Sequence, residues 1–181
     1  MSRNRTHYAV LGMLSQGEHT GYDLKKLFEE RVAHFWSESL GQIYPALHWL
    51  AEKGWVTVRT EPGQGRPDRT VYRITDEGRR AFVQWLREPP EPERVRNELL
   101  LKLFFGPQIG PEILGAIESA EARFRAALKT FDGFESQMDD IAPTAEQAMY
   151  WKLALGMGQS VVRARARWCR EARRTIQEFY G

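Results

Sequence analysis

Cysteine is almost absent from this chain of 181 residues, in which Cys169 is the only one. A single cysteine excludes an intramolecular disulfide and argues against a metal site built from thiolates. The four histidines lack the spacing of metal ligands, and no serine or cysteine lies in a nucleophile motif. The sequence therefore predicts neither an enzyme nor a protein that holds a metal or a cofactor.

Long hydrophobic runs are missing as well. Runs such as residues 99–101 and 103–105, which Lys102 separates, fall far short of the ~20 residues needed to span a bilayer. The chain starts with polar residues that lead directly into an apolar segment, unlike a targeting sequence. We expect no membrane partner and a reducing, cytoplasmic location.

Neither sign of charge is in large excess. The chain has 26 Lys and Arg against 24 Asp and Glu, which gives a formal net charge of +2. A globally basic surface is therefore not available to attract nucleic acid. Any such affinity must depend on where individual Lys and Arg side chains lie.

The most informative segment is residues 40–50, whose pattern predicts a short helix. Three apolar residues recur at helical spacing and should pack inward: Ile43, Leu47 and Leu50. Pro45 disfavours a helix interior, so we place it in the first turn of a helix that starts between residues 39 and 41 and ends at Gly54. The outer face holds our candidate readers of DNA: Gln42, Tyr44, Pro45 and His48.

The elements around this helix follow a recognisable order. Two helices are predicted before it, over residues 8–14 and 21–28. After it, residues 55–60 and 69–75 have the β-branched, alternating character of strands and flank a turn rich in Gly and Pro, as in a β-hairpin. A further helix, capped near residue 75, runs until the prolines that begin at position 89. This is the order of a winged helix-turn-helix domain.

The chain divides at a Pro-rich linker, residues 89–93, into a winged-helix domain (1–88) and a helical domain (94–181). The fold class is therefore mostly α with a small β-hairpin. A short helix is predicted over residues 94–105, and Pro111 suits the first turn of a long helix of roughly 40 Å. Along this helix, apolar residues alternate spacings of four and three, as in a coiled coil: Ile113, Ile117, Ala120, Phe124, Ala127, Phe131, Phe134 and Met138.

The apolar seam of the long helix needs a partner. One candidate is the last helix, residues 144–179, which has a looser stripe: Ala148, Trp151, Leu155, Val162, Ala166, Cys169 and Ile176. The other is a second subunit, which we favour because an isolated helical hairpin leaves much apolar surface in water. We expect a two-fold homodimer with these interface residues: Ile117, Phe124, Phe131, Phe134, Leu155 and Val162.

These motifs, taken together, resemble the PadR family of bacterial transcriptional regulators over nearly the whole chain. The matching segments are 8–14, 21–24, 35–36 with Ser39, 42–47, 54–56, 72–75 with Gly78, 96–99 and 104–105. The resemblance implies a dimeric winged-helix repressor, often released from DNA by a small aromatic or phenolic effector, an antimicrobial compound or a stress signal. Trp49 departs from the family, which commonly has a charged or polar residue there.

The site residues follow from pattern and resemblance together. Gln42 can pair with adenine, and Tyr or His can reach backbone oxygens. Arg66, at the hairpin tip, can enter a minor groove, where negative potential favours a guanidinium. The remaining candidate DNA contacts are Tyr22, Lys25, Lys26, Ser39, Arg69 and Arg73. For each residue the alternative is an ordinary solvated position.

Two further sets of residues allow more than one interpretation. Aromatic residues of the helical domain either line an effector pocket or pack in the core: Phe104, Tyr150, Trp151 and Trp168. A basic stripe either contacts phosphate, pairs across the dimer or is solvated: Arg163, Arg167, Arg170 and Arg174.

The preferred function is a repressor that binds double-stranded DNA at a pseudo-palindromic operator as a homodimer. The alternative is a winged helix that contacts a partner protein, and salt dependence of binding distinguishes the two.

Overall fold

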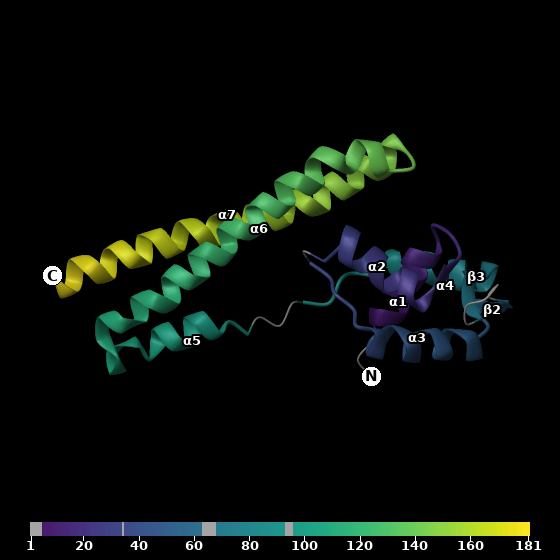
Figure 1. The fold of residues 1–181 in the computed structure, drawn as a ribbon, viewed down its shortest axis with the longest axis horizontal. Helices are drawn as coiled ribbons and strands as arrows, with labels where there is room; N and C mark the ends of the chain where they lie inside the picture. Colours follow the sequence, from purple (N-terminus) through teal and green to yellow (C-terminus); the bar gives the residue numbers. More distant parts are fainter. Residues whose placement is uncertain (1–4, 34, 63–67, 93–95) are drawn as a thin grey trace. The chain divides into compact units, whose positions relative to one another are not determined.

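The computed structural model describes residues 5–33, 35–62, 68–92 and 96–181 (Figure 1). The chain forms two compact units, Met1–Pro92 and Glu93–Gly181. The boundary between them falls within the segment that we predicted to be a Pro-rich linker.

Three helices begin the first unit: α1 (Arg5–Leu14), α2 (Gly21–Arg31) and α3 (Leu40–Glu52). Their inward faces share one hydrophobic core, in which the most deeply buried side chains are Val10, Leu11, Leu24, Phe28, Ile43, Leu47 and Leu50. The three helices and the inward face of α3 confirm the predictions from helical spacing. Gly54, just beyond α3, has φ +69°, which ends the helix in the left-handed region that glycine tolerates.

A small antiparallel sheet follows, with strand order β1-β3-β2. Its strands are β1 (His19–Thr20), β2 (Val56–Glu61) and β3 (Arg69–Ile74). The hairpin β2–β3 was predicted, whereas two residues are too short for β1 to show any alternation. One face of the hairpin enters the core through Val56, Tyr72 and Ile74. Because strand side chains alternate, Arg59 and Arg73 lie on the opposite, outer face.

The last helix of the first unit, α4 (Asp76–Leu86), begins at Thr75, whose Oγ1 accepts a hydrogen bond from the Gly78 backbone N–H at 3.1 Å. A Cβ atom on Gly78 would lie 2.1 Å from the carbonyl oxygen of Trp55, so this helix approaches the hairpin as closely as glycine allows. Aromatic rings connect α4 to α1, since Tyr8 stacks on Trp85 with centroids 4.9 Å apart.

Trp49, the residue that departs from the family pattern, belongs to the same aromatic cluster. Its ring stacks on His7 with centroids 4.1 Å apart and meets Trp55 edge-on at 5.4 Å. Burial lowers the pKa of His7 below its usual value, so the imidazole in this stack favours its neutral form. The position therefore serves packing of α3 against α1.

All the secondary-structure elements described in the second unit are helices. It contains α5 (Glu98–Phe104), two short 3-10 turns, η1 (Gly106–Gln108) and η2 (Gly110–Ile113), and two long helices, α6 (Leu114–Ile141) and α7 (Ala145–Tyr180). We predicted Pro111 in the first turn of the long helix. It lies in η2 instead, directly before that helix. At 1.5 Å per residue the 28 residues of α6 span roughly 42 Å.

The seam of α6 packs against α7 of the same chain, and Figure 1 shows the two helices side by side. The coiled-coil spacing of α6 and the stripe of α7 were correct, and α7 is the first of the two partners that we considered for this seam. The dimer interface stays a prediction for its three partly buried residues, Phe124, Phe134 and Val162. The six residues concerned lie in two clusters between α6 and α7: Ile117, Phe124, Phe131, Phe134, Leu155 and Val162. Ile117, Phe131 and Leu155 are at most 4% exposed, so a second subunit cannot reach them.

The basic stripe of α7 does not act as one surface. Arg170 and Arg173 lie 3.8 and 3.6 Å from Glu121, a carboxylate of α6 that is only 4% exposed. Arg125 approaches the same carboxylate at 2.8 Å, so three guanidinium groups compensate one buried charge. The stripe residues Arg167 and Arg174 pair instead with glutamates one turn along α7. Part of the stripe thus holds α7 against α6.

Candidate nucleic-acid interface

The site begins with the start of α3, which the chain caps with its own side chains. Gln42 Oε1 accepts hydrogen bonds from the backbone N–H of Ser39 at 3.0 Å and from its hydroxyl at 2.9 Å. This is half of a capping box, in which a side chain satisfies a free N–H at the helix end. Gln42 can therefore pair bidentately with a base only by releasing the cap.

Pro45 is the sixth residue of α3 and lies in its second turn, not in the first turn where we placed it. Proline lacks the N–H that would bond to the Gly41 carbonyl, and its ring crowds that group. The capped first turn and the packed inner face keep the helix intact despite this loss.

The four candidate readers on α3 all lie at the surface, as the helical spacing predicted: Gln42, Tyr44, Pro45 and His48. Tyr44 is 42% exposed, and one side of its ring rests against the first residue of α2. A Cβ atom on Gly21 would lie 2.7 Å from Tyr44 Cε1, so only glycine leaves room for the ring there. The contact fixes the ring of Tyr44 beside the start of α2.

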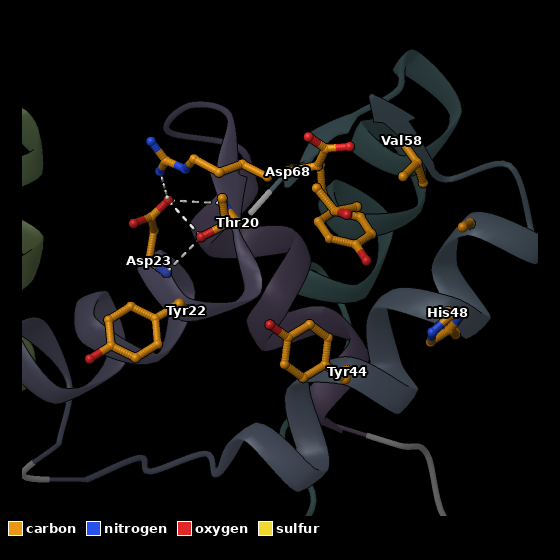
Figure 2. A pocket seen from close by; sticks show the side chains of 11 residues that line it. Thr20, Tyr22, Asp23, Tyr44, His48, Val58 and Asp68 are labelled. Atoms are coloured by element: carbon orange, nitrogen blue, oxygen red, sulfur yellow. Dashed lines mark hydrogen bonds and ion pairs between the residues drawn. The ribbon is translucent and has the colours of Figure 1, made fainter. Parts of the chain in front are cut away.

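A groove of about 630 Å³ lies between α3, the start of α2 and the hairpin (Figure 2). Four predicted site residues line it: Tyr22, Tyr44, His48 and Arg69. Tyr72 forms part of its wall, and burial together with the nearby Tyr44 raises the pKa of Tyr72 above its usual value. The structure thus brings residues from three elements to one concave surface.

Asp23 connects the wing to α2 at the edge of this groove. Its Oδ2 accepts hydrogen bonds from Thr20 N and Oγ1 at 3.0 and 2.8 Å, and lies 3.3 Å from Arg69 Nη2 (Figure 2). Burial opposes ionisation of this carboxylate, but the Thr20 hydrogen bonds and the Arg69 charge outweigh it and lower the pKa of Asp23. We did not assign Asp23 a role, although a Thr-x-x-Asp spacing is a capping-box pattern that the sequence shows.

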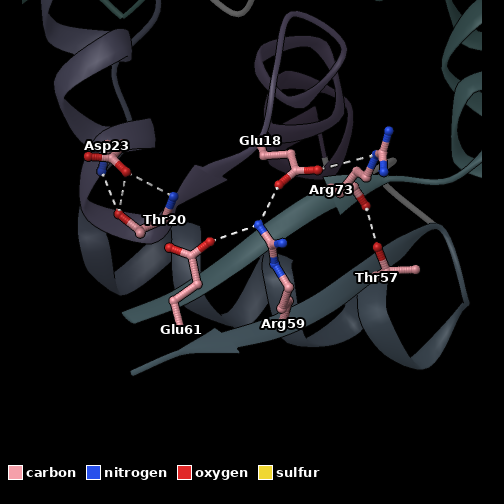
Figure 3. A network of polar contacts seen from close by, with 7 residues as sticks. All are labelled: Glu18, Thr20, Asp23, Thr57, Arg59, Glu61 and Arg73. Carbon is pink, nitrogen blue, oxygen red and sulfur yellow. Dashed lines mark hydrogen bonds and ion pairs between the residues drawn. The ribbon is translucent and has the colours of Figure 1, made fainter. Parts of the chain in front are cut away.

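The outer face of the hairpin carries further arginines, each paired with a carboxylate (Figure 3). Arg59 Nη2 lies 3.0 Å from Glu18 and 2.7 Å from Glu61, and Arg73 Nε lies 3.4 Å from Glu18. Arg73, a predicted DNA contact, lies on the outer face of the hairpin and is not among the residues that line the groove. Arg66, predicted at the hairpin tip, lies outside the described residues.

The lysines of α2 are also paired within their own helix. Lys25 and Lys26 lie 3.3 and 3.6 Å from Glu29 and Glu30, one turn further on. Such exposed pairs are weak. Both ammonium groups therefore remain accessible to a phosphate that approaches α2.

The predicted effector residues differ in exposure and in the hydrophobic cluster to which they belong. Phe104 on α5 and Tyr150 on α7 are 78% and 60% exposed. Trp151 and Trp168 pack in two different hydrophobic clusters, 17 positions apart along α7. Core packing therefore accounts for the two tryptophans, and the effector site stays a prediction.

Two kinds of structural feature were not found in the described part of the chain. None of its helices is long and apolar enough to cross a bilayer. No group of three or more His, Cys, Asp or Glu in the described ranges is placed to hold a metal ion. Burial and the Glu121 carboxylate raise the pKa of Cys169, the opposite of what a nucleophilic thiol requires.

Three helices, a hairpin and an exposed polar face on the third helix define the first unit as a winged helix-turn-helix domain. Residues 10–84 match the Transcriptional regulator PadR-like family, and residues 95–177 match the Virulence activator alpha C-term family. Residues 10–84 therefore form a domain of the PadR-like family of transcriptional regulators, as the motifs of this segment predicted.

Relatives of known description support this assignment. The negative transcriptional regulator PadR of Bacillus subtilis is 40% identical over 99 residues, an alignment that covers 54% of this chain and 54% of that protein. Its crystal structure with operator DNA matches with a TM-score of 0.81 at 28% identity, over 94% of this chain and 98% of that one. Its structure with p-coumaric acid matches with a TM-score of 0.75 at 29% identity, over 94% and 97%.

Proposed function

We propose that this protein is a DNA-binding transcriptional repressor that acts as a homodimer and is released by a small aromatic or phenolic effector. One observation carries the proposal: the exposed face of α3 and the wing border a single groove at the start of α2. The similarity of this chain to the structure of Bacillus subtilis PadR with operator DNA supports the same function.

For the side chains in and around the groove, we propose DNA contacts that suit their chemistry. Tyr44 and His48 on α3 line the protein groove. We expect them to contact bases and phosphates in the major groove of the DNA. Tyr22 and Arg69 lie at the rim of the protein groove, where they would contact the adjoining backbone. Gln42 reads a base only if binding energy replaces the hydrogen bonds of its cap.

The dimer uses surfaces other than the α6 seam. Several large apolar side chains on α5, directly after it and on α7 are 48–78% exposed, among them Leu100, Leu101, Phe104, Phe105, Tyr150, Leu153 and Met157. Exposed apolar area of this kind marks an interaction surface. A second copy that covers it forms a two-fold dimer, whose two α3 helices then read inverted half-sites about one helical turn apart or a multiple of it.

The effector acts by changing the spacing of the two reader helices. A ligand that binds better to a dimer with the wrong spacing shifts the population away from the DNA-binding state. The PadR structure with p-coumaric acid supports a phenolic acid as the chemical class.

The test is selection of tight binders from a pool of random duplex DNA with the purified full chain, followed by a salt series on the selected sequence. Enrichment of an inverted repeat, with log K falling steeply against log salt, is the expected result. Tyr44→Ala should weaken this binding, whereas Gln84→Ala, an exposed residue of α4, should not. No enrichment from the pool, or a shallow salt slope, would favour a winged helix that contacts a protein.

A further inference from the structure

The arginines of the wing, the hairpin β2–β3, are paired with carboxylates. The wing's described arginines are each within 3.4 Å of a carboxylate on the outer face or at the edge of the sheet: Arg59, Arg69 and Arg73. The carboxylates are Glu61 of β2, Glu18 directly before β1, and Asp23 in the first turn of α2. Three positive charges thus meet three negative ones, and Figure 3 shows Glu18 placed between Arg59 and Arg73.

Glu18 is the centre of this arrangement. Its two carboxylate oxygens divide between two guanidinium groups, with Oε2 3.0 Å from Arg59 Nη2 and Oε1 3.4 Å from Arg73 Nε. Glu18 lies 41 positions before Arg59 in the sequence, so the fold alone brings them together. Asp23 also caps α2, and Glu61 is the last residue of β2. Glu18 neither caps a helix nor belongs to a strand in this structure.

The geometry points to a role for Glu18 as a specificity-determining residue: it holds Arg59 and Arg73 back from DNA phosphates, and so keeps binding to non-cognate DNA weak. This inference rests on the proposed function. Phosphate contacts supply most of the affinity for non-specific DNA and carry no sequence information. A carboxylate that competes for wing arginines lowers that affinity while leaving the base contacts of α3 unchanged.

The arginines are free enough for such competition. Their side chains are 65% and 71% exposed, and exposed ion pairs are weak and break readily for a better partner. A duplex that lies against α3 brings a row of phosphates near the wing. Removing the Glu18 charge should therefore let both guanidinium groups act as phosphate contacts.

The test compares Glu18→Gln with the wild-type chain on a random 30-base-pair duplex and on the duplex selected above. Glu18→Gln should raise affinity for the random duplex about two- to fivefold, the range that exposed ion pairs allow. Its slope of log K against log salt should steepen by up to about 1.8, because each further phosphate adds about 0.9. Affinity for the selected duplex should rise less, so that the ratio of the two falls.

Glu112→Gln is the matched control, because it changes net charge equally at an exposed position in the second unit. Glu112 makes no ion pair with any part of the chain that the structure describes. A gain in Glu112→Gln equal to that in Glu18→Gln would overturn the inference, since net charge alone would explain both. An unchanged slope in Glu18→Gln would also overturn it.

A second comparison separates this inference from the proposed function. In a background of Arg59→Gln and Arg73→Gln, the further change Glu18→Gln should no longer steepen the slope. Retention on immobilised heparin, a polyanion without sequence, should follow the same order as the random duplex. A wild-type chain that bound no DNA would refute the proposed function, whereas tighter heparin retention of Glu18→Gln would still support the restraint of the arginines.

Discussion

Replacing Gly21 by alanine tests the position of Tyr44 without touching Tyr44 itself. The added Cβ would lie 2.7 Å from the ring, whereas ordinary contacts begin near 3.4 Å, so the ring must move by about 0.7 Å or rotate away. Moving a side chain off its preferred rotamer costs about 0.5–1.5 kcal/mol. Alanine in place of glycine in a helix returns up to about 1 kcal/mol. The free energy of unfolding should therefore change by less than about 1 kcal/mol.

DNA affinity should respond far more than stability. A hydrogen bond to a charged group contributes about 1.5–3 kcal/mol, so a displaced Tyr44 hydroxyl should weaken binding to the selected duplex about tenfold or more. Urea denaturation measures the first quantity and a fluorescence-anisotropy titration the second. In a Tyr44→Ala background the Gly21→Ala change should have no further effect on binding. If Gly21→Ala bound the duplex as tightly as wild type, Tyr44 would not contact DNA from its present position.

Three further changes test packing, protonation and assembly. Gly78→Ala should lower the free energy of unfolding by about 3 kcal/mol or more in urea, because its Cβ would lie 2.1 Å from the Trp55 backbone oxygen; a wild-type midpoint would contradict the close approach of α4. Burial lowers the pKa of His7, so the folded state binds this proton less readily than the unfolded state. The free energy of unfolding should therefore stay constant above pH 6.5 and fall as the pH drops below it. In thermal melts across pH, His7→Phe should show a shallower fall than wild type, and equal slopes would exclude His7 as the cause. Leu153→Glu should shift the sedimentation equilibrium towards monomer, whereas a dimer of unchanged strength would place the interface elsewhere.

Helical periodicity predicted the first unit well because its burial is local. Ile43, Leu47 and Leu50 all point inward within one helix, and spacing alone determines that they share a face. Pro45 was placed one turn too early because a proline in a second turn is tolerated when the helix is capped and packed on one side. Capping side chains identify the start of α3 better than the proline does.

The second unit shows what spacing cannot determine. The alternating pattern of α6 correctly identified its buried face, including Ile117 and Phe131, but a buried face does not name its partner. The choice between α7 and a second subunit depends on the loop between the helices, which is short enough here to fold α7 back onto α6. Leu153 and Met157 could be identified as exposed apolar residues, and so as candidates for an interface, only once that partner was known.

Charge pairing was the least predictable part of the site. Arg69 and Arg73 were correctly placed on the returning strand, but their partners Asp23 and Glu18 are about 50 positions away in sequence. Nothing local to the hairpin indicates that its positive charge is compensated. Such pairs arise from the packing of α2 and β1 against β3, which no short-range pattern encodes.

The stack of His7 on Trp49 gives the protein an optical signal of its own. Trp49 lies on α3 and meets Trp55 edge-on at 5.4 Å, so the two indoles couple and should produce a distinct band in near-ultraviolet circular dichroism. A protonated imidazole quenches a neighbouring indole, which ties the emission of Trp49 to the charge on His7. Small movements of α3 against α1 would change both signals, so the reader helix can be followed in solution without any attached label.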